Sequence, residues 1–249
     1  MRHAPTVRGV NTNGNGTHRD PRVLEGVLSN LPLFRSIAPR QIADLAARAK
    51  AIHFRRGETV CARGRCLPGL YAVAYGQIKL GFRDEGGERV VRIAAAVETF
   101  GLAAAILGRP APYEAIALED TLLVMLPAAA IAQLVENDSR FARAVIVDLA
   151  ERNMELVAEA EAGALHSGVQ RLAAYLDMLA AHEASKTSES CTVHLPTTKT
   201  VVASLLGIKK ETLSRLLRDL ARRGLIEVEQ RQIAILDRIG LTALSRDEA

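Results

Sequence analysis

The chain has 249 residues, of which 49% are apolar and only 4% are aromatic, so it holds enough aliphatic side chains for the cores of two modest globular domains. This composition excludes disorder throughout the chain. The formal net charge is only +4, but residues 195–224 hold seven Lys and Arg residues against two acidic ones, an excess of +5. A local excess of this kind favours a dedicated polyanion site over general adhesion to membranes, although a solvated helix face would carry the same charge.

Cysteine usage and the lack of long apolar runs indicate a cytoplasmic protein. The three cysteines, Cys61, Cys66 and Cys191, are odd in number and form no CxxC pair, which argues against a disulfide framework. No apolar run approaches the roughly 20 residues of a membrane span, and the N-terminus lacks the apolar core of a secretory signal. We therefore expect a protein of the reducing cytoplasm with no membrane partner.

The first part of the chain predicts a flexible arm followed by a β-rich domain. Residues 1–22 are polar and cannot bury enough apolar surface to become ordered. Residues 23–137 form the predicted domain, which begins with two short helices. From about residue 51 to residue 126 the pattern is that of short β-strands, with glycines at the positions where hairpins would turn. Closely spaced short strands are typical of an antiparallel sandwich or barrel. The segment Phe100–Leu107 interrupts these strands and predicts a short helix.

Alanine-rich helical sequence returns after the β-type runs and predicts one long helix within residues 138–165. Its apolar positions approximate an a/d seam of about three heptads, through which two copies of the chain would form a homodimer. The predicted dimer seam consists of Ile146, Leu149, Asn153, Leu156 and Ala160. The alternative is a helix that packs only on its own β-rich domain, because alanine at seam positions buries little area.

Residues 166–249 form the second predicted domain, after a hinge bracketed by Gly163 and Gly168. Within it, residues 197–224 contain two helical apolar repeats separated by a glycine, which predicts a helix-turn-helix. The second helix has a basic, polar face able to reach base edges and phosphates in a DNA major groove. The alternating pattern of residues 225–236 predicts a two-stranded wing. We therefore expect double-stranded DNA as the partner.

The order of these segments resembles the Crp–Fnr superfamily of bacterial transcription regulators over about residues 31–244. The most specific parts are RRGETVCARG, LYAVAYGQIKLGF, FGLAAAILG and GIKKETLSRLLRDLARRGLIE. The resemblance implies an α+β fold with an N-terminal cyclic-nucleotide-binding-like β-roll, a long dimerisation helix and a C-terminal winged helix-turn-helix. It also implies a homodimeric regulator that contacts RNA polymerase and whose effector domain changes the angle between two recognition helices.

The second helix of the helix-turn-helix carries the most specific residues. Glu211, Ser214 and Arg215 match the E-x-x-S-R pattern of the Fnr-like branch, which implies a TTGAT half-site in an inverted repeat. By their chemistry, arginine can donate bidentately to guanine, glutamate can accept from an exocyclic amine, and serine can reach a thymine edge. The predicted phosphate contacts are Thr198, Lys199, Thr200, Lys209, Lys210 and Arg218. The first three match positions at which family members bind the DNA phosphate backbone. For Thr198, capping of the helix is an alternative of equal weight.

The sensor domain departs from relatives that bind cyclic nucleotide or an iron–sulfur cluster. Relatives that bind cyclic nucleotide carry a glutamate after the glycine of the inserted helix and an Arg-Ser pair downstream, but here Leu102 follows Gly101 and no such pair occurs. A cluster needs four cysteine ligands, three of them near the N-terminus, and no cysteine precedes Cys61. We therefore expect neither cAMP nor an iron–sulfur cluster.

The C-terminal run is most similar to the dissimilatory nitrate respiration regulators, and that resemblance implies a response to nitric oxide through haem. The predicted effector pocket, an apolar slot beside the long helix, consists of Gly101, Leu102, Ala105, Ile106 and Tyr113. A haem iron there would take a histidine as axial ligand. No local haem motif selects among the histidines, which are His3, His18, His53, His166, His182 and His194. We favour His53, nearest the roll, or His166, in the hinge, although each could instead be an ordinary surface or hydrogen-bonded residue.

Two other classes of function stay open. An enzyme with its site in the β-rich domain would need a feature such as a phosphate loop, a nucleophile elbow or an HExxH motif, and the sequence has none of these, so we expect no catalysis. A ligand-independent DNA binder, or one that responds to oxidation of Cys61 and Cys66, would have the same fold. For the two cysteines, ordinary packing is the simpler role.

Overall fold

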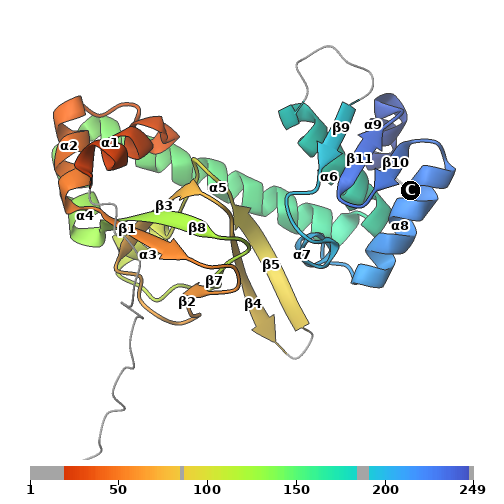
Figure 1. Ribbon diagram of the computed structural model, residues 1–249, viewed down its shortest axis with the longest axis horizontal. Coiled ribbons are helices and arrows are strands. Elements are labelled where there is room, and N and C mark those ends of the chain that lie inside the picture. Colours follow the sequence, from red (N-terminus) through yellow and green to blue (C-terminus); the bar gives the residue numbers. More distant parts are fainter. Residues whose placement is uncertain (1–19, 85–86, 184–190, 247–249) are drawn as a thin grey trace, which may run out of the picture.

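The computed structural model describes residues 20–84, 87–183 and 191–246, and it contains two domains joined by a long helix (Figure 1). Its helices are α1 (Pro21–Asn30), η1 (Pro32–Phe34), α2 (Pro39–Arg48), α3 (Leu102–Leu107), α4 (Ala128–Asn137), α5 (Ser139–Leu165), α6 (Gly168–Glu183), α7 (Lys199–Leu205), α8 (Lys210–Arg222) and α9 (Arg238–Arg246). Its strands are β1 (Lys50–Phe54), β2 (Thr59–Cys61), β3 (Gly69–Tyr75), β4 (Ile78–Asp84), β5 (Gly87–Ala94), β6 (Thr99–Phe100), β7 (Glu114–Ala117), β8 (Thr121–Pro127), β9 (Cys191–His194), β10 (Ile226–Glu229) and β11 (Gln232–Ile235). The expected α+β fold class is confirmed.

The first domain is a β-roll of two four-stranded antiparallel sheets. Their strand orders are β1-β8-β3-β6 and β2-β7-β4-β5. Successive side chains of a strand point to opposite faces, so in β3 Tyr71 and Val73 face the core between the sheets, while Leu70 and Ala72 face the helices. Tyr71 stacks on Phe100 with 5.1 Å between ring centroids. The sheet containing β3 is therefore buried on both faces and forms the middle layer of the domain.

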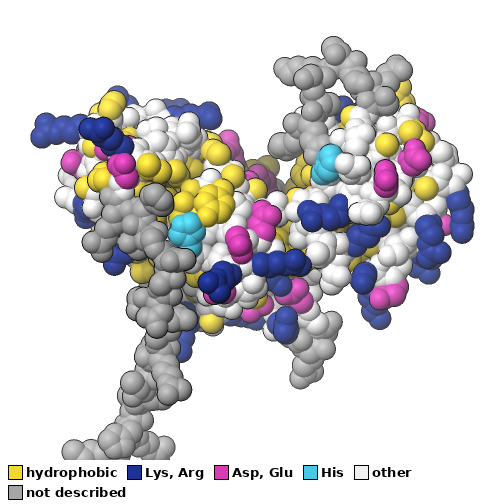
Figure 2. Space-filling model, viewed as in Figure 1, with side chains coloured by type: hydrophobic (Ala, Val, Ile, Leu, Met, Phe, Trp, Pro, Cys, Tyr) yellow, Lys and Arg dark blue, Asp and Glu magenta, His cyan; other side chains and the backbone are white. Residues whose placement is uncertain are grey.

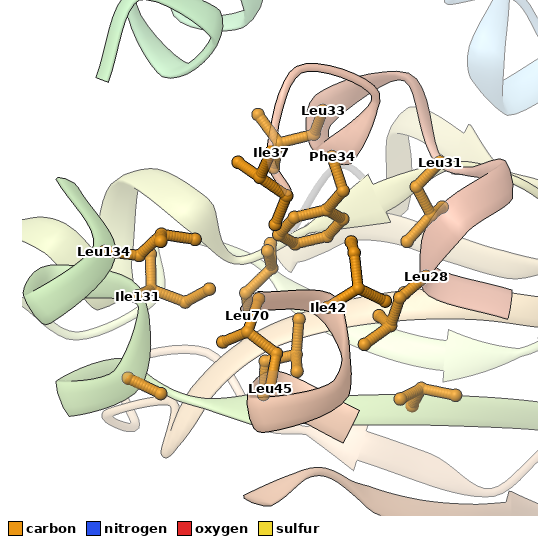
Figure 3. Close-up of a cluster of buried hydrophobic side chains, with 14 of the residues drawn as sticks. Leu28, Leu31, Leu33, Phe34, Ile37, Ile42, Leu45, Leu70, Ile131 and Leu134 are labelled. Atoms are coloured by element: carbon orange, nitrogen blue, oxygen red, sulfur yellow. The ribbon is translucent and has the colours of Figure 1, made fainter. Parts of the chain in front are cut away.

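The N-terminal helices cover the outer face of this sheet. Side chains from α1, η1, α2, β3 and α4 converge in one apolar cluster (Figure 3). The long helix α5 enters the same cluster through Phe141, which stacks on Phe34 of η1 with 5.5 Å between ring centroids. This packing fixes the first turns of α5 against the sensor domain, so movement of the helices would be transmitted to α5.

The start of α5 is capped by a buried aspartate that also holds α2. Asp138 accepts hydrogen bonds from the backbone N–H groups of Arg140 and Phe141 at 2.9 and 3.0 Å, and Gln41 of α2 donates to its other oxygen at 3.0 Å. The bond from Phe141 and the one from Gln41 are the main causes that lower the pKa of Asp138 below its ordinary 3.8. The charged carboxylate therefore stabilises the junction of α2 and α5.

We expect Asp138→Ala to lower the Tm by a few degrees at neutral pH. Because the folded-state pKa is depressed, the stabilisation is fully present above the unfolded-state pKa and is lost as the pH falls through the folded-state value. Thermal melts of wild type and variant should therefore differ at neutral pH and converge as the pH falls below the depressed pKa of Asp138. Asp44→Ala, at an exposed position of α2, serves as the control. A difference that does not change with pH would contradict this role.

The expected arm is wrong at its end, because α1 begins at Pro21 rather than after residue 22. Asp20 caps the helix by accepting a hydrogen bond from the backbone N–H of Arg22 at 3.0 Å, and proline suits the first helical position because it has no N–H to satisfy there. Residues 1–19 lie outside the described residues, so the rest of the arm stays a prediction.

The second domain has its own apolar core, built by α6, α7, α8, α9 and the three-stranded sheet β10-β11-β9. It is joined to α5 through His166 and Ser167, where the chain is extended at His166 before α6 begins. Ser167 and Gln170 form a reciprocal capping box, with each side chain accepting from the other's backbone N–H. Among the described residues, no helix is long and apolar enough to cross a membrane.

Candidate nucleic-acid interface and effector site

Helices α7 and α8 form the predicted helix-turn-helix. Thr198 caps α7 by accepting from the backbone N–H of Val201 at 3.4 Å, which confirms the capping role. The turn passes through Gly207, whose φ of 64° lies in the left-handed region that favours glycine. The buried side chains of both helices pack in the core of the second domain. This packing leaves the opposite face of α8 exposed.

The structure brings the three predicted base-contact residues together on that exposed face. Glu211 and Arg215 are exposed and lie four residues apart, so their side chains are neighbours on one face of the helix. Ser214 is half-buried beside them. Figure 2 shows Lys and Arg side chains gathered over the second domain, where α8 lies at the edge of the molecule. Arginine, glutamate and serine on one exposed helix face can read base edges in a major groove.

The predicted phosphate-contact residues lie on both helices around this face. Lys199 from the start of α7 lines the same open groove as Ser214 and Arg218 of α8, with strand β10 as its other wall. Lys209 and Lys210 are exposed at the start of α8. The sequence prediction did not include Glu227 of β10, which also lines this groove and places a negative charge near the cations. Its alternating position in the wing was the signal that could have identified it.

Helix α5 exposes apolar side chains both within the predicted dimer seam and outside it. Ile146, Asn153, Leu156 and Ala160 are exposed, whereas Leu149 packs against the apolar cluster of its own domain. The helix also exposes Val147, Met154, Val157 and Leu165. The alternative of a helix packed only on its own β-rich domain therefore fails for its second half. The exposed apolar stripe consists of Ile146, Ala150, Met154 and Val157. It shares Ile146 with the predicted seam and otherwise runs along a neighbouring face of the helix, which does not include Leu149.

The residues predicted for the effector pocket pack in different surroundings. Leu102 is buried in the cluster between the helices and the sheet, and Ala105 is half-buried, but Ile106 is 39% exposed. Tyr113 packs instead against the core between the two sheets, where burial raises the pKa of its phenol. Gly101 has a φ of 89°, and a Cβ there would lie 2.8 Å from Leu67. The phenol of Tyr113 nevertheless forms a hydrogen bond with the backbone of Gly101, and three of the six residues of α3 are exposed, so the apolar slot stays a prediction.

A charged cluster between strand β5 and α5 was missed from the sequence. Arg92 donates to the carbonyl of Thr99 at 3.1 Å and to the carboxylate of Glu98 at 3.2 Å. Burial lowers the pKa of Arg92, Glu98 opposes this shift, and Arg152 of α5 adds to it. Arg152 in turn lies 3.6 Å from Glu155. No alternating pattern indicated this role, because residues 91–93 are all half-buried and the β4–β5 register is irregular between Val90 and Arg92.

The two candidate haem ligands are exposed and have partners of their own. His53 is exposed on β1, and its Nδ1 is 3.0 Å from the hydroxyl of Tyr75, so this pair occupies one ring nitrogen. His166 is exposed at the end of α5, where its carbonyl accepts a hydrogen bond from Arg171. Both side chains are exposed, so neither histidine is enclosed in an apolar site such as the one predicted for haem.

The three cysteines are arranged as packing or surface residues. Cys61 is buried in the core between the sheets, Cys66 is exposed, and Cys191 lies in the other domain. Burial, with a smaller effect of Cys66, raises the pKa of the Cys61 thiol. A raised pKa disfavours the reactive thiolate at neutral pH. Three cysteines in two domains also give too few ligands for a four-cysteine cluster.

The chain is similar to known regulators along both domains. A family model described as a cyclic nucleotide-binding domain matches residues 51–138, and one described as a Crp-like helix-turn-helix domain matches residues 170–244. The CRP-like cAMP-activated global transcriptional regulator of Mycobacterium tuberculosis is 25% identical over 216 residues, covering 86% of this chain and 96% of the relative. The transcriptional activator protein FnrA of Stutzerimonas stutzeri is 26% identical over 215 residues, covering 81% and 82%.

The fold is also shared with a solved structure. FixK2 from Bradyrhizobium japonicum superposes with a TM-score of 0.70 at 20% identity, covering 81% of this chain and 99% of that chain. Each family model matches the part of the chain whose architecture it describes, and the relatives span both domains in the same order. The chain therefore belongs to the Crp/Fnr family of DNA-binding transcription regulators, with an N-terminal effector-binding domain and a C-terminal helix-turn-helix.

Proposed function

We propose that the protein acts as a homodimer that binds an Fnr-type inverted repeat with TTGAT half-sites and regulates transcription from it. Arg215 contacts guanine, Glu211 an exocyclic amine, and Ser214 a thymine edge. The observation that carries the proposal is the exposure of Glu211 and Arg215 side by side on α8, with Ser214 next to them. Two recognition helices are needed because one helix covers only a half-site.

Phosphate contacts position these helices on the duplex. Lys199 and Arg218 line one groove, which suits a single strand of the DNA backbone passing between α8 and the wing. Thr198, Thr200, Lys209 and Lys210 complete the proposed set. In a gel-shift titration, the full chain should bind a TTGAT inverted repeat on the order of a hundredfold more tightly than the same DNA with scrambled half-sites. Equal affinity for the two duplexes would refute the proposed operator.

For the effector, haem with nitric oxide is the proposal that the similarity of the C-terminal run supports, in preference to cAMP or an iron–sulfur cluster. Leu102 occupies the position at which cyclic-nucleotide binders carry glutamate, and it is buried in an apolar cluster. The exposed positions of His53 and His166 do not favour haem, so no step of the mechanism is assigned to it. A ligand-independent or thiol-responsive regulator is the alternative.

Absorption spectroscopy separates these effector proposals. Protein reconstituted with haem should show a Soret band that shifts with nitric oxide, and its affinity for the inverted repeat should change with that shift. Unchanged absorbance together with unchanged DNA affinity would remove the haem proposal and leave the ligand-independent or thiol-responsive one. The regulator role also implies contact with RNA polymerase, a cytoplasmic location and no catalysis of its own.

A further inference from the structure

Strand β5 of the sensor domain makes its second edge contact with the DNA-binding domain rather than with another strand. It ends the sheet β2-β7-β4-β5, so within the described residues one edge of β5 has no neighbouring strand. On that edge the hydroxyl of Ser204, in α7, accepts a hydrogen bond from the N–H of Val90 at 2.9 Å and donates to the carbonyl of Glu88 at 2.7 Å. Residues i and i+2 of a strand present these groups to the same side. One serine therefore satisfies two edge groups that another strand would otherwise satisfy.

A second side chain of β5 closes the same contact. The guanidinium of Arg89 donates to the carbonyl of Ser204 at 3.4 Å and lies against Gly207, where a Cβ would collide with it. Gly207 forms the turn between α7 and α8, next to the start of the recognition helix. Glycine at position 207 therefore has two roles, because it adopts the left-handed turn conformation and leaves room for the guanidinium of Arg89. The sensor domain touches the helix-turn-helix at its turn.

The same strand reaches the charged cluster at α5. Arg92 lies two residues beyond Val90, on the other side of an irregularity in the β4–β5 register that leaves Val91 unpaired. Its guanidinium holds the backbone and side chain of residues 98 and 99, which lead into α3. A displacement of this cluster would shift β5 along or across its pairing with β4. The hydrogen bonds to Ser204 would then lose their geometry, since such bonds weaken steeply with misalignment.

We propose that Ser204 and Arg89 form a latch that fixes the DNA-binding domain on strand β5 in a DNA-competent orientation. In this orientation Glu211 and Arg215 are exposed, so the latched sensor domain does not cover the reading face. Without the latch, the DNA-binding domain would be held mainly by the short connection at residues 166–167 and would sample other angles. The latch therefore couples the position of β5 to the spacing of two recognition helices. Its effect on affinity rests on the DNA-binding function proposed above.

Amide hydrogen exchange on the full chain tests the contact itself. In Ser204→Ala, the N–H of Val90 loses the hydroxyl that accepts its hydrogen bond, and we expect its exchange to accelerate roughly five- to tenfold. The N–H of Arg89 points toward β4 by alternation and should keep its protection. Alanine favours the helix, so α7 should persist, which circular dichroism checks. Ser245→Ala, which removes a hydroxyl bonded only within α9, is the matched control. Unchanged exchange at Val90 would overturn the latch.

DNA binding tests what the latch does. We expect Ser204→Ala and Arg89→Ala each to weaken binding to the inverted repeat by roughly five- to tenfold, with the double variant less than additive because both changes open one contact. Unchanged or tighter binding in variants with faster Val90 exchange would overturn the DNA-competent assignment. If the wild type fails to prefer the inverted repeat, the proposed operator is wrong, while the exchange comparison still judges the latch.

Discussion

Arg215→Ala should bind the TTGAT inverted repeat no more tightly than scrambled DNA, while keeping a weaker, salt-sensitive affinity for both. A bidentate contact from arginine to guanine contributes about 1–3 kcal/mol of discrimination. A dimer makes this contact twice, so the specific affinity should fall on the order of thirtyfold or more. The surrounding lysines and Arg218 are unchanged, so nonspecific phosphate binding should persist. Competition gel shifts at two salt concentrations measure both quantities.

Arg222→Ala is the matched control for this prediction. Arg222 lies on the same helix, seven residues after Arg215, and its guanidinium is 3.2 Å from the carboxylate of Asp219. Loss of this charge should weaken binding to all sequences alike and leave the preference for TTGAT intact. If Arg215→Ala retains full discrimination, Arg215 does not read a base and the assignment of the reading face is wrong.

The architecture could be predicted because each segment repeats a local pattern. The apolar repeats on either side of Gly207 are regular enough to identify two helices, and the alternating strands of the roll are separated by glycines. The positions of Glu211, Ser214 and Arg215 follow directly, because a helix with one buried face must expose the other. Period alone therefore determined the reading face of α8.

The effector region could not be predicted in the same way because its arrangement depends on non-local packing. Helix α3 is too short for its period to say which side is buried, and Leu102 and Ile106 end in different environments. Helix α5 has a weak pattern, so a seam drawn through Leu149 includes a side chain that its own domain covers. The contact of Ser204 with strand β5 joins residues more than a hundred positions apart, and no local pattern signals it.

Val157→Glu, in the exposed apolar stripe of α5, should convert a dimer into a monomer. Ile146, Met154 and Val157 are 66%, 67% and 56% exposed in the single chain. Exposed apolar side chains in a row along a helix mark an interaction surface. In a two-fold dimer the same side chains of both subunits are buried, so each position contributes twice. At roughly 25 cal/mol per Å² of apolar area, several such side chains supply a substantial part of the association energy. A carboxylate at position 157 would be desolvated in that interface without a partner.

The variant should dissociate at concentrations where the wild type is dimeric, and its dimer dissociation constant should rise on the order of a hundredfold. The reason is that each dimer would bury two unpaired carboxylates, at a total cost of several kcal/mol. Sedimentation equilibrium measures this change. Ala132→Glu, which places the same charge on the exposed face of α4, should leave the dimer intact. Because a monomer carries one recognition helix, affinity for the inverted repeat should fall to that for a single half-site. A Val157→Glu protein that is still dimeric would exclude this stripe as the dimer interface and place the seam elsewhere on the chain.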